Sequence, residues 1–205
     1  AKRLTDTWTN IPGQSSTTPL VHYTYVSFGN QSTVTTRSAA STTRTTAYTY
    51  DNSNRVTRID YPSPLGYEEY GYNTAGNMQW KRDGSGAITL YKYDNLNRLT
   101  NTYYNYTGSL ETITYPATAD VTYAYEGGTS LKTTMTDTAG TSTYAYDAQD
   151  RLLTYTPPKP AGHAAITYTY NNMGQKTGIS TTGYNVTYTY YAGGQLKSVN
   201  LSGTP

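Results

Sequence analysis

The chain has 205 residues, a net charge of +2 and only 14% charged side chains. A nucleic-acid partner is therefore not expected, because such partners require a clustered basic surface. The absence of cysteine excludes disulfides, thiol catalysis and cysteine-based metal sites. Twenty-five tyrosines stand beside one phenylalanine, and this favours β-strands with a core of tyrosine rings, since aromatic side chains suit a pleated surface.

The N-terminal part of the chain lacks the pattern that organises the rest. We expect residues 1–22 to form an irregular segment or half of a repeat, and residues 23–205 to form an array of about eight repeats. The first residue is Ala1 and no signal-peptide pattern follows, so we expect a processed product or a piece of a longer protein. No apolar run approaches the roughly 18 residues of a membrane span, so membrane insertion is not expected.

Pairs of tyrosines separated by one residue recur along the chain at intervals of 20 to 32 residues. Two such tyrosines point to the same face of a strand, because strand side chains alternate with a period of two. A recurrence of this kind is typical of repeat architectures. The first tyrosines of the eight pairs are Tyr23, Tyr48, Tyr70, Tyr91, Tyr123, Tyr144, Tyr168 and Tyr188.

The residues after each pair predict a tight turn and a returning strand. In the copy that runs from Tyr91 to Leu99, Asp94 caps the turn, Asn97 takes a left-handed backbone and Leu99 begins the return strand. The capping residues of the copies are Asp51, Asn73, Asp94, Asp147 and Asn171. The residues expected to have a left-handed backbone include Asn54, Gly76, Asn97, Gly174 and Gly194.

Second turns rich in glycine or proline return the chain to the next tyrosine pair, as at 83–86 and 157–162. Each repeat is thus predicted to contain two strands and two turns. The long interval from Tyr91 to Tyr123 suits an extended hairpin or an inserted loop. No stretch has the 3.6-residue periodicity of a helix, so helices are not expected.

The motif Tyr-x-Tyr-Asp-x-x-Asn/Gly/Asp-Arg-Leu resembles the YD repeat of the Rhs family, which also occurs in insecticidal toxin complexes and teneurins. The best matches run over 48–56, 91–99 and 144–152. The resemblance implies an all-β fold in which tandem hairpins form a continuous antiparallel ribbon that spirals as a shell, sheath or solenoid-like fibre. In many members the shell holds a toxic C-terminal domain. The family's closing motif, Asp-Pro-x-Gly-Leu, is absent from these residues, so the resemblance covers the repeat tract.

The sequence offers no catalytic constellation. His22 and His163 lie far apart in the sequence. Neither has an acidic residue or a nucleophile at a spacing typical of a catalytic site. The turn aspartates share their column with Asn73, Asn171, Val26 and Tyr191, which fits turn capping better than a ladder of calcium ligands. We therefore predict no enzyme activity, no catalytic or metal-binding residue and no cofactor. Arginines four residues after an Asp are expected to form exposed ion pairs worth about 0–1 kcal/mol each.

The tyrosine columns have two interpretations. They hold neighbouring hairpins together, or their rings form a platform for sugars. The structural interpretation is favoured because the pairs recur in every repeat. The best local candidate for glycan contact is the group Tyr103, Tyr104 and Tyr106. Sequence motifs for N-glycosylation occur at Asn30, Asn105, Asn185 and Asn200, and they matter if the chain is secreted from a glycosylating cell.

These patterns predict a non-catalytic structural scaffold, the wall segment of a secreted or cell-surface Rhs/YD-repeat protein. The wall would surround a toxin or form an extracellular fibre or sheath. The alternative is a carbohydrate- or cell-surface-binding adhesion module. The last repeat is nearly as regular as the middle ones, whereas repeat arrays usually end in atypical caps. The expected partners are therefore adjoining repeats of a parent chain, or further copies end to end.

Overall fold

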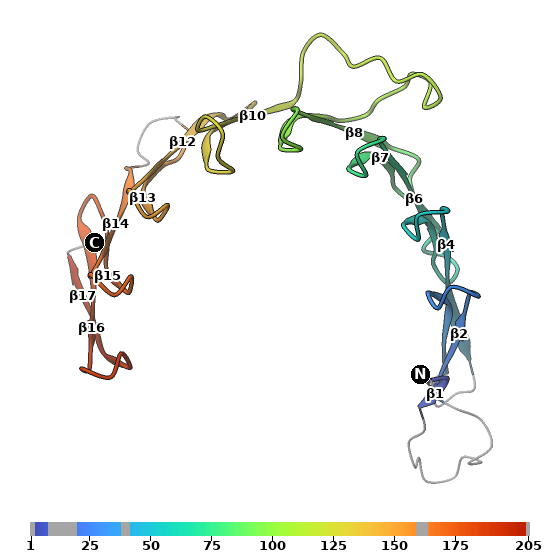
Figure 1. Cartoon of the computed structure of the whole chain (residues 1–205), viewed down its shortest axis with the longest axis horizontal. Helices are drawn as coiled ribbons and strands as arrows, with labels where there is room; N and C mark the ends of the chain where they lie inside the picture. Colours follow the sequence, from blue (N-terminus) through green and yellow to red (C-terminus); the bar gives the residue numbers. More distant parts are fainter. Residues whose placement is uncertain (1–2, 8–19, 38–41, 159–163, 204–205) are drawn as a thin grey trace. The chain divides into compact units, whose positions relative to one another are not determined.

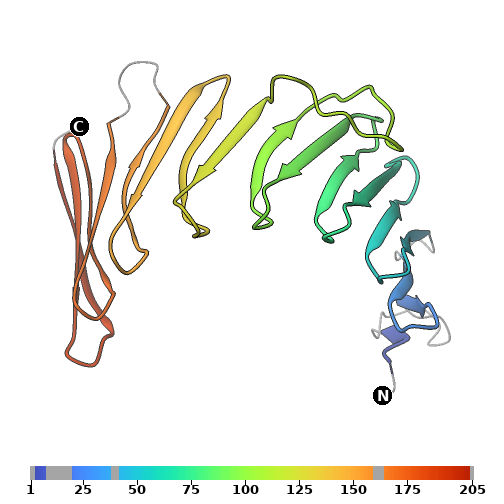
Figure 2. The ribbon, with the colours of Figure 1, turned by 45° about the horizontal axis from the view of Figure 1, so that its top comes forward.

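The chain is all-β, as predicted. The computed structural model describes residues 3–7, 20–37, 42–158 and 164–203, and every regular element within them is a β-strand. Consecutive strands form antiparallel hairpins (Figures 1 and 2). The described residues contain no helix that is long and apolar enough to cross a membrane.

The chain divides into two compact units, which are described separately. The first comprises residues 1–91 and 104–115. Its strands pair in chain order from β1 to β8, each with the next. They are β1 (Asp6–Thr7), β2 (Val21–Tyr25), β3 (Gln31–Arg37), β4 (Thr43–Tyr50), β5 (Val56–Asp60), β6 (Tyr67–Tyr72), β7 (Met78–Arg82) and β8 (Ile88–Tyr93), the last two residues of β8 falling in the second unit.

The second unit comprises residues 92–103 and 116–205. Its strands also pair in chain order, from β9 to β17. They are β9 (Leu99–Tyr103), β10 (Val121–Tyr125), β11 (Lys132–Asp137), β12 (Gly140–Tyr146), β13 (Leu152–Thr156), β14 (Ile166–Tyr170), β15 (Lys176–Thr181), β16 (Tyr184–Tyr190) and β17 (Leu196–Gly203).

The turn after the tyrosine pair has one backbone geometry in all but one of the hairpins whose turn is described. In the β4–β5 hairpin the N–H of Asp51 donates to the carbonyl of Arg55 at 2.9 Å, and Asn54 donates back to Asp51 at 3.0 Å. Asn54 has φ = 61°, in the left-handed region that Asn, Asp and Gly tolerate best. The equivalent residues with positive φ are Gly29, Gly76, Asn97, Asp150, Gly174 and Gly194.

Each tyrosine-led hairpin also contains a β-bulge that the sequence pattern did not predict. Tyr50 pairs with Val56 whereas Thr49 pairs with Arg58, so Thr57 is an extra residue in the return strand. The same shift lies just before the second tyrosine of the other hairpins whose pairing is described, at Tyr25, Tyr72, Tyr125, Tyr146, Tyr170 and Tyr190.

The hairpin of β10 and β11 departs from the aligned pattern by one residue. Its left-handed residue is Gly128, with φ = 72°, and not the aligned Thr129. Tyr125 pairs with Lys132, as Tyr146 pairs with Leu152. The turn is therefore one residue longer, and Lys132 replaces Leu131 as the first residue of the return strand.

The two faces of the sheet in the second unit differ in chemistry. The tyrosine pairs and aliphatic residues share one face, as in the register pairs Tyr144↔Tyr155 and Tyr168↔Ile179. The other face carries small hydroxyl side chains, as in Thr134↔Thr143 and Thr154↔Thr167. Few side chains are fully covered; the buried apolar residues among those described are Leu90, Tyr103 and Val121. The fold is therefore held together strand by strand and not by a thick core.

The long interval after β9 contains an inserted loop. Within the first unit, the N–H of Tyr106 donates to the Ile88 carbonyl at 2.9 Å, and the Tyr115 hydroxyl donates to the Tyr91 carbonyl at 3.0 Å. The loop thus lies along β8, the strand that contains Leu90, which is 0% exposed. Of the expected turn at 157–162, residues 159–162 lie outside the described ranges.

Candidate functional site: the clasp between successive hairpins

The turn aspartates hold two backbone N–H groups and one guanidinium each. In the turn after β12, Asp147 Oδ1 accepts from the N–H groups of Gln149 and Arg151 at 2.9 and 3.0 Å, and Oδ2 accepts from Arg151 Nε at 2.6 Å. Asp51 and Asp94 have the same arrangement. Both oxygens of each carboxylate are therefore engaged in shaping the turn.

The arginine of each turn also reaches the next hairpin. The guanidinium of Arg151 lies over the ring of Tyr170, 4.7 Å from its centroid, and its Nη1 donates to the Asn171 carbonyl at 3.3 Å. Arg55 lies over Tyr72 in the same way, at 4.4 Å. The predicted ion pairs of these arginines with the aspartates four residues earlier do form, and only the predicted exposure of the arginines was wrong. They are partly buried, and they join one repeat to the following one.

The second tyrosine of seven of the eight pairs returns a hydrogen bond to the preceding hairpin. The Tyr170 hydroxyl donates to the carbonyl of Leu152, the residue after Arg151, at 2.9 Å. Equivalent bonds of 2.5–3.0 Å run from Tyr25, Tyr50, Tyr72, Tyr125, Tyr146 and Tyr190 to Leu4, Gln31, Val56, Leu99, Lys132 and Lys176. We call this unit the clasp. It consists of the capped turn, the side chain four residues after the capping residue, and the second tyrosine of the next pair.

The clasp that follows β14 lacks charge. In the turn after β14, Asn171 Oδ1 accepts from the N–H groups of Met173 and Gln175 at 3.0 Å, and its Nδ2 donates to Gln175 Oε1 at 2.8 Å. Gln175 Nε2 then donates to the Gly194 carbonyl of the next turn at 2.7 Å. Amides therefore cap this turn as Asp147 caps its own, and join it to the next turn through another backbone carbonyl than the one Arg151 uses.

Every described junction between hairpins has the same register. The residue just before a tyrosine pair lies opposite the third residue after the clasp arginine or its equivalent, as in Thr154↔Thr167, where Thr167 precedes Tyr168. The other junctions are Asp6↔His22, Thr33↔Ala47, Arg58↔Glu69, Trp80↔Leu90, Asn101↔Thr122, Thr134↔Thr143 and Gly178↔Thr187. One stacking rule thus holds within both units.

The clasp changes the pKa of its acidic and phenolic groups. The backbone N–H of Arg55 and then its guanidinium lower the pKa of Asp51, and Arg98 does the same for Asp94. Burial opposes this effect at Asp147, but the hydrogen bonds from Arg151 prevail and its pKa is also lowered. Burial raises the pKa of Tyr72, so its hydroxyl keeps the proton that it donates.

No metal site is built on these carboxylates. Within the described ranges, no group of three or more His, Asp or Glu side chains could hold a metal ion. His22 does have an acid partner, contrary to expectation, because its Nδ1 lies 2.8 Å from Asp6 Oδ1 across the β1–β2 pair. This pair is exposed, and the described residues place no nucleophile in hydrogen-bond contact with the ring. His163 lies outside the described residues.

The first unit also contains a charged cluster on β5, β6 and β7. On one face Glu69 lies between Arg58 and Arg82, at 2.9 and 2.5 Å. On the other face Glu68 pairs with Lys81 at 2.6 Å and accepts a hydrogen bond from Tyr70. These contacts lower the pKa of Glu68, Lys81 contributing most. The charges satisfy one another, so the cluster ties three strands together and presents no uncompensated charge.

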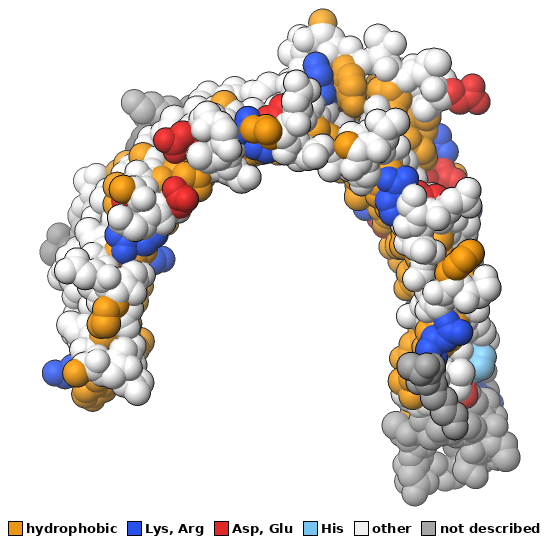
Figure 3. Space-filling view, in the orientation of Figure 1, with side chains coloured by type: hydrophobic (Ala, Val, Ile, Leu, Met, Phe, Trp, Pro, Cys, Tyr) orange, Lys and Arg blue, Asp and Glu red, His pale blue; other side chains and the backbone are white. Residues whose placement is uncertain are grey.

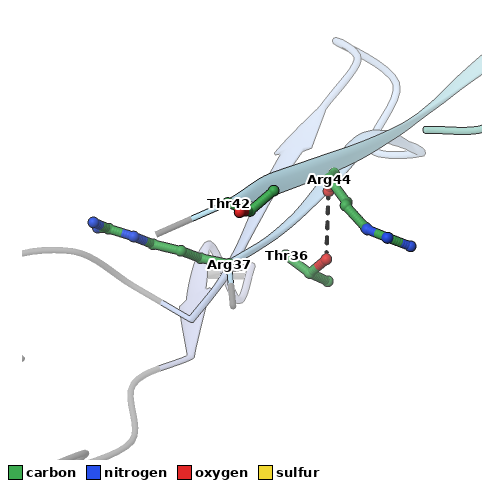
Figure 4. Close-up of a pocket in the computed structure, with 4 residues that line it drawn as sticks. All are labelled: Thr36, Arg37, Thr42 and Arg44. Carbon is green, nitrogen blue, oxygen red and sulfur yellow. Dashed lines mark hydrogen bonds between the residues drawn. The ribbon is translucent and has the colours of Figure 1, made fainter. Parts of the chain in front are cut away.

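On one face of the described residues, the charged side chains do not gather into a patch of one sign. On the face shown in Figure 3, Lys and Arg lie singly or beside Asp and Glu. A hollow of about 390 Å³ in the first unit is lined by Thr36, Arg37, Thr42 and Arg44 (Figure 4). Figure 4 shows the two arginines extending in opposite directions, so they do not converge on an anion. Thr36 bonds only the Arg44 carbonyl there, at 3.4 Å.

The three tyrosines proposed for glycan contact do not form a surface patch. Tyr103 is only 5% exposed, so its ring is not available, whereas Tyr104 is 52% exposed. The Tyr106 hydroxyl donates to the Ser109 carbonyl of its own loop at 3.3 Å. Of the N-glycosylation motifs, Asn105, Asn185 and Asn200 are exposed, and Asn30 is half-buried and donates to Asn54 Oδ1 at 3.3 Å.

Sequence reasoning missed several residues of the clasp. Gln175 was not singled out, although it occupies the arginine column and amides satisfy the same acceptors. Asp83 caps a second turn with the same geometry, since its Oδ1 accepts from Ser85 and Ala87 and Gly86 has φ = 90°. The Asp83-Gly84-Ser85-Gly86 spacing resembles the first turns closely enough to have indicated this.

A repeat protein whose hairpins stack by a single rule is the class that this fold defines. A family profile described as teneurin YD-shell matches residues 14–204, and the chain belongs to that family. The resemblance to YD repeats is therefore confirmed. A search of curated proteins found no match.

Solved structures share the fold at low sequence identity. The crystal structure of TcdB2-TccC3 is 15% identical, with a TM-score of 0.63 over 92% of this chain and 11% of that one. The structure of TcdB2-TccC3-TEV is 14% identical, with a TM-score of 0.55 over 89% of this chain and 12% of that one. The chain thus spans about one ninth of the length of the solved chains that it matches.

Proposed function

We propose that this chain is a non-catalytic wall segment of a secreted or cell-surface YD-repeat protein. Membership of the YD-shell family supports a structural shell role. The observation that carries the proposal is the constant junction, in which strand register, bulge, capped turn and tyrosine hydroxyl recur from hairpin to hairpin. Because every junction is made in the same way, repeats extend the sheet without creating a unique site on it, and this suits a wall.

The distribution of polar groups supports a structural role over a catalytic one. The aspartates, arginines and second tyrosines of the charged clasps are engaged with one another or with the backbone. The acidic residues of the β5–β7 cluster are paired with Arg58, Arg82 and Lys81. These groups are therefore committed to holding strands, which leaves them poorly placed for acid–base or nucleophilic work.

The wall would enclose a cargo carried by another part of the protein, or form an extracellular sheath. We would test this on the native protein, recovered from its source with an antibody raised against these 205 residues. Negative-stain microscopy should show closed hollow particles or long filaments, and intact mass should show which larger polypeptide contains the segment. Compact solid particles of the segment's own mass would contradict the proposal.

The adhesion alternative keeps one surface feature, the exposed ring of Tyr104. A glycan array comparing the chain with its Tyr104→Ala variant would test it, with Tyr184→Ala, which removes another exposed ring, as the matched control. We expect no glycan signal from the parent chain. A signal lost only in Tyr104→Ala would favour adhesion over the wall.

A further inference from the structure

One hairpin of the second unit places two tyrosine rings against each other. Tyr144 of β12 lies opposite Tyr155 of β13 in the strand register, and the ring centroids are 5.3 Å apart with an angle of 34° between the planes. This separation lies in the range at which two aromatic rings touch. The two strands are joined by the turn that Asp147 and Arg151 hold, so the register keeps the two phenols in contact.

The repeat does not require this contact. In the other hairpins whose pairing is described, the first tyrosine of the pair lies opposite an aliphatic residue, a methionine or a lysine. These register pairs are Tyr23↔Val34, Tyr48↔Ile59, Tyr70↔Lys81, Tyr123↔Met135, Tyr168↔Ile179 and Tyr188↔Val199. A second phenol opposite Tyr144 therefore adds a chemical capacity that the stacking of hairpins does not need.

The hydroxyl groups of this pair take no part in the clasps. The Tyr155 hydroxyl makes no hydrogen bond to the described residues, whereas the hydroxyl of Tyr146 donates to the Lys132 carbonyl at 3.0 Å. The hydroxyl of Tyr144 lies beside the side chain of Ser142, which forms a hydrogen bond with it. Chemical change at Tyr144 and Tyr155 therefore leaves the bonds between hairpins intact.

Solvent reaches the pair from one side. Tyr155 lines an open hollow of about 520 Å³ together with residues that include Pro157, Ile166 and Tyr184. Burial, and then the neighbouring Tyr155, raise the pKa of Tyr144, so this phenol is protonated at neutral pH. Oxidation of such a phenol releases a proton as well as an electron, and the hollow gives solvent and a small oxidant access to the pair.

We infer that Tyr144 and Tyr155 form an oxidative cross-linking site, at which a one-electron oxidant of the haem peroxidase class joins β12 to β13 through a dityrosine bond. The chain contains no cysteine, so disulfides cannot lock its hairpins, whereas coupled phenols can. The bond closes the hairpin over the turn at 147–151. A covalent closure of this kind stabilises a hairpin because it restricts the unfolded chain.

The coupling is a two-electron oxidation. Each phenol loses one electron and its hydroxyl proton and becomes a neutral tyrosyl radical. The two radicals form a carbon–carbon bond between ring positions next to the hydroxyl-bearing carbons. Each bonded carbon then loses its hydrogen as a proton and the adjacent oxygen takes up a proton, which restores both phenols. One hydrogen peroxide molecule accepts the two electrons and two protons and becomes two water molecules.

The test treats the full chain, at a dilution that keeps it monomeric, with a haem peroxidase and one equivalent of hydrogen peroxide. We expect the monomer to lose the mass of two hydrogen atoms and to gain dityrosine fluorescence. Tandem mass spectrometry should map the new bond to Tyr144 and Tyr155. Free tyrosine treated in the same way establishes that the oxidant works, and dichroism establishes that the chain and its variants are folded.

Phenylalanine variants identify the two rings. Tyr144→Phe and Tyr155→Phe should each abolish this cross-link. Tyr168→Phe is the matched control, because it removes a first tyrosine that faces Ile179, and it should leave the cross-link unchanged. The converse variant Ile179→Tyr places a second phenol opposite Tyr168 in the same register, and it should create an additional cross-link at that pair.

The oxidised chain should also unfold at a temperature a few degrees higher than the untreated chain, and Tyr155→Phe should lose this rise. Dityrosine located mainly at other tyrosines, such as Tyr155 with Tyr184, would overturn the inference. So would dityrosine formed mainly between separate chains, or none at all in a mixture that couples free tyrosine.

Discussion

Two adjacent clasps of the second unit shape a turn and reach the next one with different chemistry. At Asp147 and Arg151 a carboxylate shapes the turn and a guanidinium reaches Tyr170 and the Asn171 carbonyl. At Asn171 and Gln175 two amides do both tasks. The capping distance is again 3.0 Å, and Gln175 Nε2 donates to the Gly194 carbonyl of the next turn at 2.7 Å. The backbone turn therefore sets the geometry of the junction, and the charged side chains strengthen a junction that neutral amides can also make.

The comparison predicts that damage to the turn geometry should exceed damage to the charged contacts. Gly174 has φ = 78° and an added Cβ would meet no atom within 4 Å, as at Gly127, whose φ is not positive. Gly174→Val should cost about 2 kcal/mol more than Gly127→Val, because a β-branched residue is strained in the left-handed region. Urea unfolding of both variants measures this, and equal losses would show that the left-handed residue does not govern the turn.

The second effect should be the loss of the charged connection. Arg151→Ala removes the stacking on Tyr170 and the bonds to Asp147 and Asn171, and should cost about 1–2 kcal/mol. Gln175→Ala should cost less, about 0.5–1 kcal/mol, because only neutral hydrogen bonds are lost. Chemical unfolding at low and high salt compares them, and only the arginine contribution should shrink with salt. A larger loss at Gln175 would reverse our reading of the two clasps.

A smaller effect should follow from the tyrosine hydroxyl. Tyr170→Phe keeps the ring beneath Arg151 and removes the donor to Leu152, and should cost about 0.5–1.5 kcal/mol. The control is Tyr168→Phe, whose hydroxyl makes no hydrogen bond to the described residues. Thermal melting of both variants checks the difference. Equal losses in the two variants would indicate that the hydrogen bond from the second tyrosine to the preceding hairpin contributes nothing to stability.

At neutral pH the smallest effect should come from Asp147→Asn, since Asn171 shows that an amide oxygen caps this turn equally well. The folded-state pKa values of Asp51, Asp94 and Asp147 are lowered. Their contribution to stability is therefore complete above the unfolded pKa of about 4, and is lost as the pH falls through the folded value. As the pH is lowered below 5, the free energy of unfolding should fall less for the triple Asp→Asn variant than for the parent. Parallel pH profiles would argue against carboxylate linkage.

Much of this protein could be predicted from local patterns. The tyrosine pairs, the capping residues such as Asp94 and the left-handed residues such as Asn97 mark hairpins, because a turn depends on residues within five positions of one another. The extra turn residue that places Lys132 in the Leu99 column was missed, since Gly127-Gly128 permits two alignments and only strand pairing distinguishes them.

The sequence alone determined the all-β fold, the repeat and the family, since side-chain alternation and turn chemistry act over a few residues. Only the tertiary structure decided what the clasp side chains do. Arg151 meets Tyr170 nineteen positions later, and the Tyr170 hydroxyl selects the Leu152 carbonyl, because the register places them together. Only the structure shows that Tyr103 is buried and that Asp6 lies opposite His22. Such contacts depend on how one hairpin lies against the next, which no pattern within a single hairpin specifies.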